Sequence, residues 1–213
     1  MIVLGLDTCL SACSVAVLDG EAVLAHASEV MARGHQERLA PMAQAVMAEA
    51  GIPFSRLQRI GATVGPGSFT GLRVGVAFAK GLGSALSVPA VGVGSLEALA
   101  AEAAGLVAAV LDARRDQLYL QVFEDGQALM APDVLPLGVA VARLAELAMG
   151  RALTLVGSGA PLLADTAPGA NVLTPEGCDP RAVARLAAGK PAAPIRPLYL
   201  RAPDAKLPGG VTP

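Results

Sequence analysis

Aromatic side chains are scarce in this sequence of 213 residues. Phe, Tyr and Trp together make up 3% of it, and Trp is absent. A surface that stacks nucleic-acid bases needs aromatic rings, and a domain that binds nucleic acid by itself usually carries a basic patch. The formal net charge is instead −2. We therefore do not expect this chain alone to bind nucleic acid strongly.

Cysteine and long apolar runs are scarce as well. The three cysteines, Cys9, Cys13 and Cys178, form an odd and sparse set, which is typical of a protein in a reducing compartment. No apolar run reaches the length of a membrane span, and Met1–Asp7 carries no basic segment of the kind that begins a secretion signal. These features predict a cytoplasmic protein without membrane contact.

Charged residues make up only 16% of the chain, whereas hydrophobic residues make up 54%. This composition excludes a disordered chain. Most of the apolar residues are Ala, Val and Leu, and such small side chains suit closely packed helices and buried strands.

Short apolar runs separated by turn residues set out the expected elements. Asp19-Gly20 is a strong hairpin turn, and a helical period follows it. The second half of the chain repeats this order in a less regular form. Strands are expected over residues 2–7, 12–18, 21–28, 60–64, 89–93, 106–111, 117–123 and 152–156, and helices over residues 35–50, 70–86, 95–105, 137–149 and 179–189.

The repeated order predicts an α/β fold of two related subdomains with mixed sheets. The first subdomain is expected over residues 1–104 and the second over residues 105–206. Prolines are frequent from Lys190 onward, and residues 207–213 are expected to form a disordered tail.

A glycine-rich turn, Gly65-Pro66-Gly67-Ser68-Phe69-Thr70-Gly71-Leu72-Arg73, leads from a strand into a helix. It is not a Walker A loop, because Leu72 stands where that motif needs lysine. It is not a dinucleotide fingerprint either, because its third glycine comes one residue late. We interpret Gly65, Gly67 and Gly71 as a structural glycine loop with positive φ angles. An anion at the helix N-terminus remains the alternative.

The chain offers no convincing catalytic or metal-binding set. His26 and His35 lie nine residues apart on different elements, whereas a helical metal pair needs a spacing of three or four. Neither Ser68 nor Ser158 lies in a Gly-x-Ser-x-Gly elbow. We therefore expect no catalytic residue, no metal ligand and no cofactor on this chain.

The helix after the glycine loop is apolar around about two-thirds of its circumference. A helix that lies on one sheet buries a single stripe, so this one needs a second apolar neighbour. That neighbour is either part of its own subdomain or another chain. For the second case we expect the outward strip to contain Val74, Ala77, Phe78 and Gly81.

At these residues the sequence resembles the TsaB (YeaZ) family. The resemblance is carried by Asp7-Thr8, His35-Gln36-Glu37-Arg38-Leu39, the glycine loop Gly65–Arg73 with Ala79-Lys80-Gly81-Leu82, and the segment Pro197-Leu198-Tyr199-Leu200-Arg201. It is strong over about residues 1–100 and weaker afterwards. Asp7-Thr8 also resembles the first phosphate loop of actin-like ATPases, which carries glycine soon after the aspartate. Here Cys9 and Leu10 occupy that turn.

The resemblance implies an actin-like duplicated fold of the hexokinase and Hsp70 type that has lost catalysis. It implies a scaffold subunit that dimerises or pairs with the catalytic protein TsaD, while the ATPase TsaE joins the pair. That complex puts threonylcarbamoyl on the adenosine beside the anticodon, and tRNA contact comes only through the complex. Nucleotide is implied only at a shared interface. The expected partner-binding residues are Leu39, Met42, Val46, Val74, Ala77, Phe78 and Gly81.

Two enzymes are the alternatives. A small-molecule kinase of the same fold would need an intact phosphate loop, which Cys9 and Leu10 do not favour. A glycoprotease-like metallopeptidase would need a metal-binding histidine pair separated by three residues, as the paralogue TsaD carries, and this sequence does not contain one.

Overall fold

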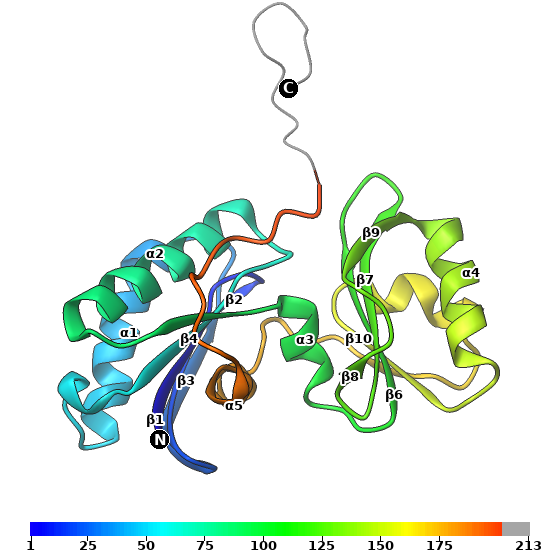
Figure 1. Ribbon diagram of the computed structural model, residues 1–213. Helices are drawn as coiled ribbons and strands as arrows, with labels where there is room; N and C mark the ends of the chain where they lie inside the picture. The colour runs from blue at the N-terminus through cyan, green and yellow to red at the C-terminus, as the bar shows by residue number, and fades with distance from the viewer. Residues whose placement is uncertain (202–213) are drawn as a thin grey trace, which may run out of the picture.

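A computed structural model describes residues 1–201 of the chain. Two subdomains lie side by side, each built on its own sheet (Figure 1). The predicted tail, residues 207–213, lies outside the described residues. Within them, no helix is long and apolar enough to cross a membrane.

The first sheet has five strands in the order β3-β2-β1-β4-β5. The pairs β1–β2 and β2–β3 are antiparallel, whereas β4 pairs with β1 and β5 with β4 in parallel. The order therefore combines a hairpin unit with two added parallel strands. The bounds are β1 Ile2–Asp7, β2 Ala12–Asp19, β3 Ala22–Val30, β4 Arg59–Thr63 and β5 Ala90–Val93.

The second sheet repeats this arrangement. Its order is β11-β10-β6-β7-β8, and β9 also pairs with β7. The β6–β7 pair is antiparallel, whereas β10 pairs with β6 and β11 with β10 in parallel. The duplication predicted from the sequence is thus confirmed. The bounds are β6 Leu106–Asp112, β7 Gln117–Glu124, β8 Gln127–Ala128, β9 Asp133–Pro136, β10 Leu153–Val156 and β11 Asn171–Leu173.

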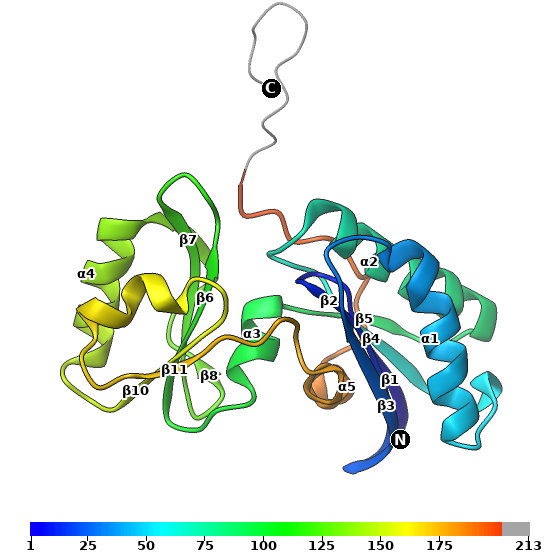
Figure 2. The same cartoon turned by 180° about the vertical axis from the view of Figure 1, so that it is seen from behind.

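Helices cover both faces of the first sheet (Figures 1 and 2). α1 and α2 pack on one face, and α5 packs on the other. α3 lies between the sheets, and α4 and the 3-10 helix η2 cover the outer face of the second sheet. A further 3-10 helix, η1, follows α1. The bounds are α1 His35–Glu49, η1 Phe54–Arg56, α2 Phe69–Leu86, α3 Ser95–Ala100, α4 Leu137–Ala148, η2 Ala160–Thr166 and α5 Pro180–Gly189.

The predicted range of the second subdomain, 105–206, is wrong at its C-terminal end. α5 packs on β1, β2 and β4 of the first sheet, and the segment after it stays with the same subdomain. Ile195 is buried in the first core, and the Leu198 N–H donates to the Val64 carbonyl at 2.7 Å. We call residues 190–201 the C-terminal strap. The chain therefore returns to its first subdomain after it has built the second.

Two glycines seat α5 directly on the first sheet. A Cβ at Gly5 would lie 2.2 Å from the Pro180 carbonyl oxygen, and one at Gly61 would lie 2.4 Å from the Ala187 Cβ. Such distances are well below van der Waals contact. At the other end of α5, the Arg59 guanidinium donates to the Ala187 and Ala188 carbonyls at 2.8 and 3.1 Å. Glycine in two neighbouring strands thus allows a close helix–sheet approach.

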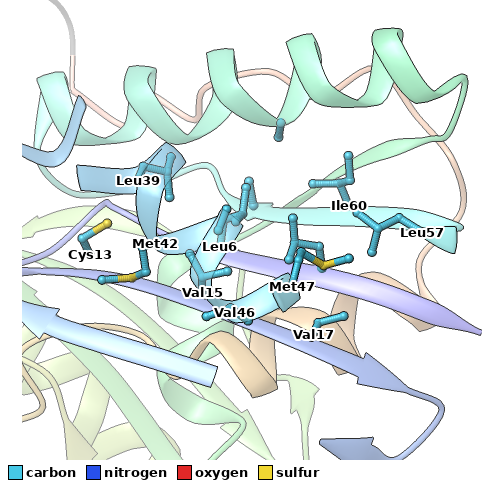
Figure 3. Packing of buried hydrophobic residues seen from close by; sticks show 14 of the residues in the cluster. Leu6, Cys13, Val15, Val17, Leu39, Met42, Val46, Met47, Leu57 and Ile60 are labelled. Carbon is cyan, nitrogen blue, oxygen red and sulfur yellow. The ribbon is translucent and has the colours of Figure 1, made fainter. Parts of the chain in front are cut away.

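The first core holds most of the large side chains of α1. Leu39, Met42 and Val46 are at most 2% exposed and lie among Leu6, Val15, Ile60 and their neighbours (Figure 3). The prediction that these three residues face a partner is therefore wrong for the folded chain. The helical period identified one face of α1 correctly, but that face packs against the chain's own sheet.

Candidate functional site

Asp7 ends β1 and is completely buried. Its Oδ1 accepts hydrogen bonds from the Cys9 N–H at 3.0 Å and the Thr63 hydroxyl at 2.6 Å, and its Oδ2 accepts one from the Cys178 N–H at 2.8 Å. Burial raises the pKa of Asp7, and the three donors oppose that rise only in part. The carboxyl group thus joins the first turn, the end of β4 and the entry to α5.

The glycine loop packs directly on the turn that follows Asp7. A Cβ at Gly67 would lie 2.3 Å from the Cys9 carbonyl oxygen, and one at Gly71 would lie 1.9 Å from the Thr8 carbonyl oxygen. The Thr8 hydroxyl donates to the Gly71 carbonyl at 2.7 Å, and the Ser68 N–H donates to the Cys9 carbonyl at 2.7 Å. The start of α2 is therefore held by hydrogen bonds to the Thr8-Cys9 turn.

The structural interpretation of the glycine loop needs one correction. Gly65 has a φ of +104°, as predicted, but Gly67 and Gly71 are not among the described glycines with positive φ. What requires glycine at these two positions is close approach to Thr8 and Cys9. The side chain of Ser68 caps α2 by accepting from the Gly71 N–H at 3.2 Å.

A cavity of about 460 Å³ lies between the two subdomains. The β1–β2 turn lines it from the first subdomain, and the β6–β7 turn lines it from the second. Polar groups of the second turn already have hydrogen-bond partners within the protein. The Asp112 carboxylate accepts from the Arg114 N–H at 2.7 Å, and the Asp112 N–H donates to the hydroxyl of Ser158, which follows β10, at 3.2 Å. His35 also lines the cavity, at 8% exposure.

The structure does not bring the histidines and cysteines into one site. His26 is exposed on β3, and His35 is buried at the start of α1. All three cysteines are buried and free, and burial raises the pKa of the Cys9 thiol to about 12. Among residues 1–201, no three His, Cys, Asp or Glu side chains are placed to hold a metal ion.

Small side chains form one strip of the outward face of α2, beside the exposed cations Arg73 and Lys80. Ala77 and Gly81 are exposed, whereas Val74 and Phe78 are half-buried at the edge of the first core. On α1 the exposed positions are mostly polar or small: Gln36, Glu37, Arg38, Ala40, Pro41, Gln44, Ala45, Ala48 and Glu49. The two helices together form one outer face, and Ala77 and Gly81 of the predicted partner-binding residues lie on it.

Sequence reasoning missed one exposed cluster, at the start of α2. Phe69 is 56% exposed and Tyr199 of the strap is 49% exposed, and their ring centroids lie 5.9 Å apart. The Arg73 guanidinium carbon lies 3.6 Å from the Phe69 ring centroid, and Arg73 Nε donates to the Tyr199 hydroxyl at 3.0 Å. The sequence motifs contained all three residues but gave no sign that the strap returns to α2.

Comparison with known proteins shows which family this chain belongs to. A family model described as "TsaD: tRNA N6-adenosine threonylcarbamoyltransferase" matches residues 26–161. An uncharacterized protein of Mycobacterium tuberculosis is 35% identical over 206 residues, which cover 96% of this chain and 93% of that protein. The tRNA threonylcarbamoyladenosine biosynthesis protein TsaB of Escherichia coli is 32% identical over 149 residues, 63% of this chain and 64% of that protein.

Solved structures agree. YeaZ from Pseudomonas aeruginosa superposes with a TM-score of 0.79 at 30% identity, and the match covers 93% of this chain and 99% of that one. A ROK hexokinase from Thermus thermophilus shares the fold at a TM-score of 0.51 and 16% identity, over 88% of this chain and 98% of that one. The predicted actin-like fold is thereby confirmed, and the chain belongs to the TsaB (YeaZ) family of tRNA threonylcarbamoyladenosine biosynthesis proteins.

Proposed function

We propose that this chain is a non-catalytic scaffold subunit of a cytoplasmic complex that puts threonylcarbamoyl on the adenosine beside the anticodon of tRNA. In this proposal it pairs with a TsaD protein, which carries the chemistry, and the pair recruits the ATPase TsaE. It carries no cofactor of its own, and any nucleotide binds at an interface shared with a partner.

The contact between α2 and the first turn carries this proposal. Thr8 and Cys9 follow Asp7 at the position where an actin-like ATPase would present its first phosphate loop. Here Gly67 and Gly71 pack against the carbonyl groups of that turn, and both Asp7 oxygens already accept hydrogen bonds from the protein. The Thr8 and Cys9 carbonyls are thus covered by the glycine loop, which supports a structural use of the motif, while Leu10 and Ser11 of the same turn line the cavity between the subdomains.

The small exposed residues on the outer face of α1 and α2 support the scaffold role. Exposed Ala77 and Gly81 let another helix approach closely, and half-buried Val74 and Phe78 offer apolar contact beside them. Because both helices are held by a complete core beneath them, their outer face is available to a second protein. We propose that this face meets TsaD, or a second copy of the chain when TsaD is absent.

Asp7→Asn tests whether the chain contributes to the chemistry. The variant keeps the size of the side chain, and threonylcarbamoyl transfer is measured in a reconstituted complex in which the amount of paired subunit is matched to that of the wild type. We expect an unchanged rate per complex. A large loss of rate in a fully assembled complex would favour the alternative that this chain is an enzyme, such as a kinase of the same fold.

A further inference from the structure

The strap and α2 contain no carboxylate of their own, and the one carboxylate recorded against the strap, Glu97 of α3, pairs with Lys190 and also lines a pocket with Arg196. Residues 50–96 contain no Asp or Glu, and neither do residues 180–201. These two segments lie side by side, because Lys80 and Arg196 line one open groove of about 770 Å³ and Arg73 bonds to Tyr199. Figure 1 shows the strap running beside α2. We call Arg73, Lys80 and Arg196, with Phe69 and Tyr199, the α2–strap face.

The cations of this face are not neutralised. Arg73, Lys80 and Arg196 are all exposed, and none of them forms an ion pair with a described residue. Elsewhere in residues 1–201, most cationic side chains do have a carboxylate partner, as Arg151 has in Glu124. A protein with a net charge of −2 therefore keeps a local excess of positive charge on one side.

The aromatic part of the face is preorganised. Arg73 lies over the Phe69 ring and is fixed by its hydrogen bond to Tyr199, which lowers the entropy that binding would cost. Only Nε of the guanidinium is used in that bond, and neither terminal nitrogen has a hydrogen bond to a described residue. Two exposed rings beside a guanidinium suit an unstacked base with its phosphate.

We infer that the α2–strap face binds single-stranded or looped RNA, with the three cations on phosphates and Phe69 and Tyr199 on a base. The choice of tRNA as that RNA rests on the proposed function. Composition alone did not favour nucleic-acid binding, because the low aromatic content and the net charge of −2 describe the whole chain and not one surface. The fold gathers two exposed rings and three unpaired cations in one place.

The test is a titration of unmodified tRNA against the chain alone and against its complex with TsaD, at several salt concentrations. The triple variant Arg73→Glu, Lys80→Glu, Arg196→Glu should weaken binding by more than about tenfold near 0.1 M salt. It should also make the slope of log K against log salt shallower by about 2, because each phosphate contact on a single strand contributes about 0.7. Arg143→Glu on α4 is the control for one charge reversal in the second subdomain, and it is compared both with each single reversal, Arg73→Glu, Lys80→Glu or Arg196→Glu, and with the triple variant.

Ring variants separate stacking from charge. Phe69→Ala and Tyr199→Ala should each weaken tRNA binding by roughly 5- to 100-fold, the range for one stacked base, while they leave heparin binding almost unchanged. Tyr199→Phe keeps the ring but removes the hydrogen bond that fixes Arg73, so its affinity for tRNA should lie between those of the wild type and Tyr199→Ala. Equal losses for tRNA and heparin in the ring variants would reduce the face to a general anion surface and overturn the base contact.

The outcomes distinguish this inference from the proposed function. If the triple variant binds tRNA as tightly as Arg143→Glu does, the inference is wrong. If the triple variant no longer pairs with TsaD on size-exclusion chromatography, the face is a protein interface, which overturns the RNA surface and leaves the scaffold role standing. If the wild-type chain never pairs with TsaD, the scaffold role fails, and the titration of the chain alone still decides on the RNA surface.

Discussion

A side-chain carbon at Gly71 would lie 1.9 Å from the carbonyl oxygen of Thr8. The first turn of α2 and the turn after β1 therefore touch through their backbones, and neither can move away while the Thr8 hydroxyl holds the Gly71 carbonyl at 2.7 Å. The same motif that resembles a phosphate loop in the sequence is here a packing contact. The following predictions start from this contact.

Gly71→Ala should destabilise the chain. Because the added carbon meets backbone atoms, which cannot rotate away, we expect a loss of about 1–3 kcal/mol in the free energy of unfolding, as for overpacking of a core. The measurement is thermal unfolding followed by circular dichroism, where about 2–4 °C is expected per kcal/mol for a protein of this size.

Gly81→Ala on the same helix is the control. No atom lies within 4 Å of the position where its Cβ would stand, and alanine is favoured over glycine inside a helix by about 0.8–1 kcal/mol. Gly81→Ala should therefore raise the melting temperature. Equal effects of the two substitutions would mean that the contact with Thr8 does not decide the need for glycine.

Gly5→Ala should loosen the attachment of α5 to the first sheet. Its Cβ would stand 2.2 Å from the Pro180 carbonyl oxygen, so the helix must shift outward, and urea unfolding should show a loss of about 1–3 kcal/mol. Gly189→Ala, at the open end of the same helix, should cost nothing. If Gly5→Ala unfolded at the same urea concentration as the wild type, the close packing of α5 on the first sheet would be refuted.

The buried carboxyl group of Asp7 should make stability depend on pH. Burial raises its pKa in the folded chain above the ordinary value of 3.8, so the unfolded chain releases this proton first as the pH rises. The contribution of Asp7 is therefore largest below about pH 4 and declines as the pH passes through the raised pKa. Between those limits the free energy of unfolding of the wild type should fall relative to that of Asp7→Asn.

Denaturant unfolding of both proteins at several pH values checks this prediction. The difference between wild type and Asp7→Asn is the useful quantity, because other titrating groups cancel in it. A difference that grows in favour of the wild type from pH 4 upward would show that the hydrogen bonds from Cys9, Thr63 and Cys178 outweigh burial, and that the pKa of Asp7 is lowered instead.

The repeated fold could be predicted from the sequence because its signals are local. The Asp19-Gly20 turn sets the first hairpin, and the apolar period of residues 35–50 sets a helix that the structure places at His35–Glu49. The two sheets then repeat the same strand order. Local turn and period signals are sufficient for such elements.

Contacts between distant segments could not be predicted in the same way. A period shows that Leu39, Met42 and Val46 share a face, but it does not say whether that face meets the sheet or a partner. The pairing of Arg73 with Tyr199 joins residues 126 positions apart. A local sequence pattern in either segment cannot show that the two segments meet. The aromatic cluster and the packing of α5 on the first sheet are therefore seen only in the folded chain.

Pairing with TsaD through the α1 and α2 face tests the central claim most directly. Ala77 is exposed in the outward strip of α2, and a glutamate there puts a long charged side chain where a second helix would approach closely. It should block that contact even if its carboxylate pairs with Arg73 or Lys80, which lie four residues before it and three after it. Ala142→Glu on α4 is the matched control, because Ala142 is also an exposed helical alanine but lies in the second subdomain.

The measurement is size-exclusion chromatography of each protein mixed with TsaD, with a melting curve for each variant alone. We expect a stable complex for the wild type and for Ala142→Glu, no complex for Ala77→Glu, and wild-type melting for both variants. A folded Ala77→Glu that still binds TsaD would contradict the proposed interface, and a wild-type chain that does not bind TsaD at all would contradict the scaffold role.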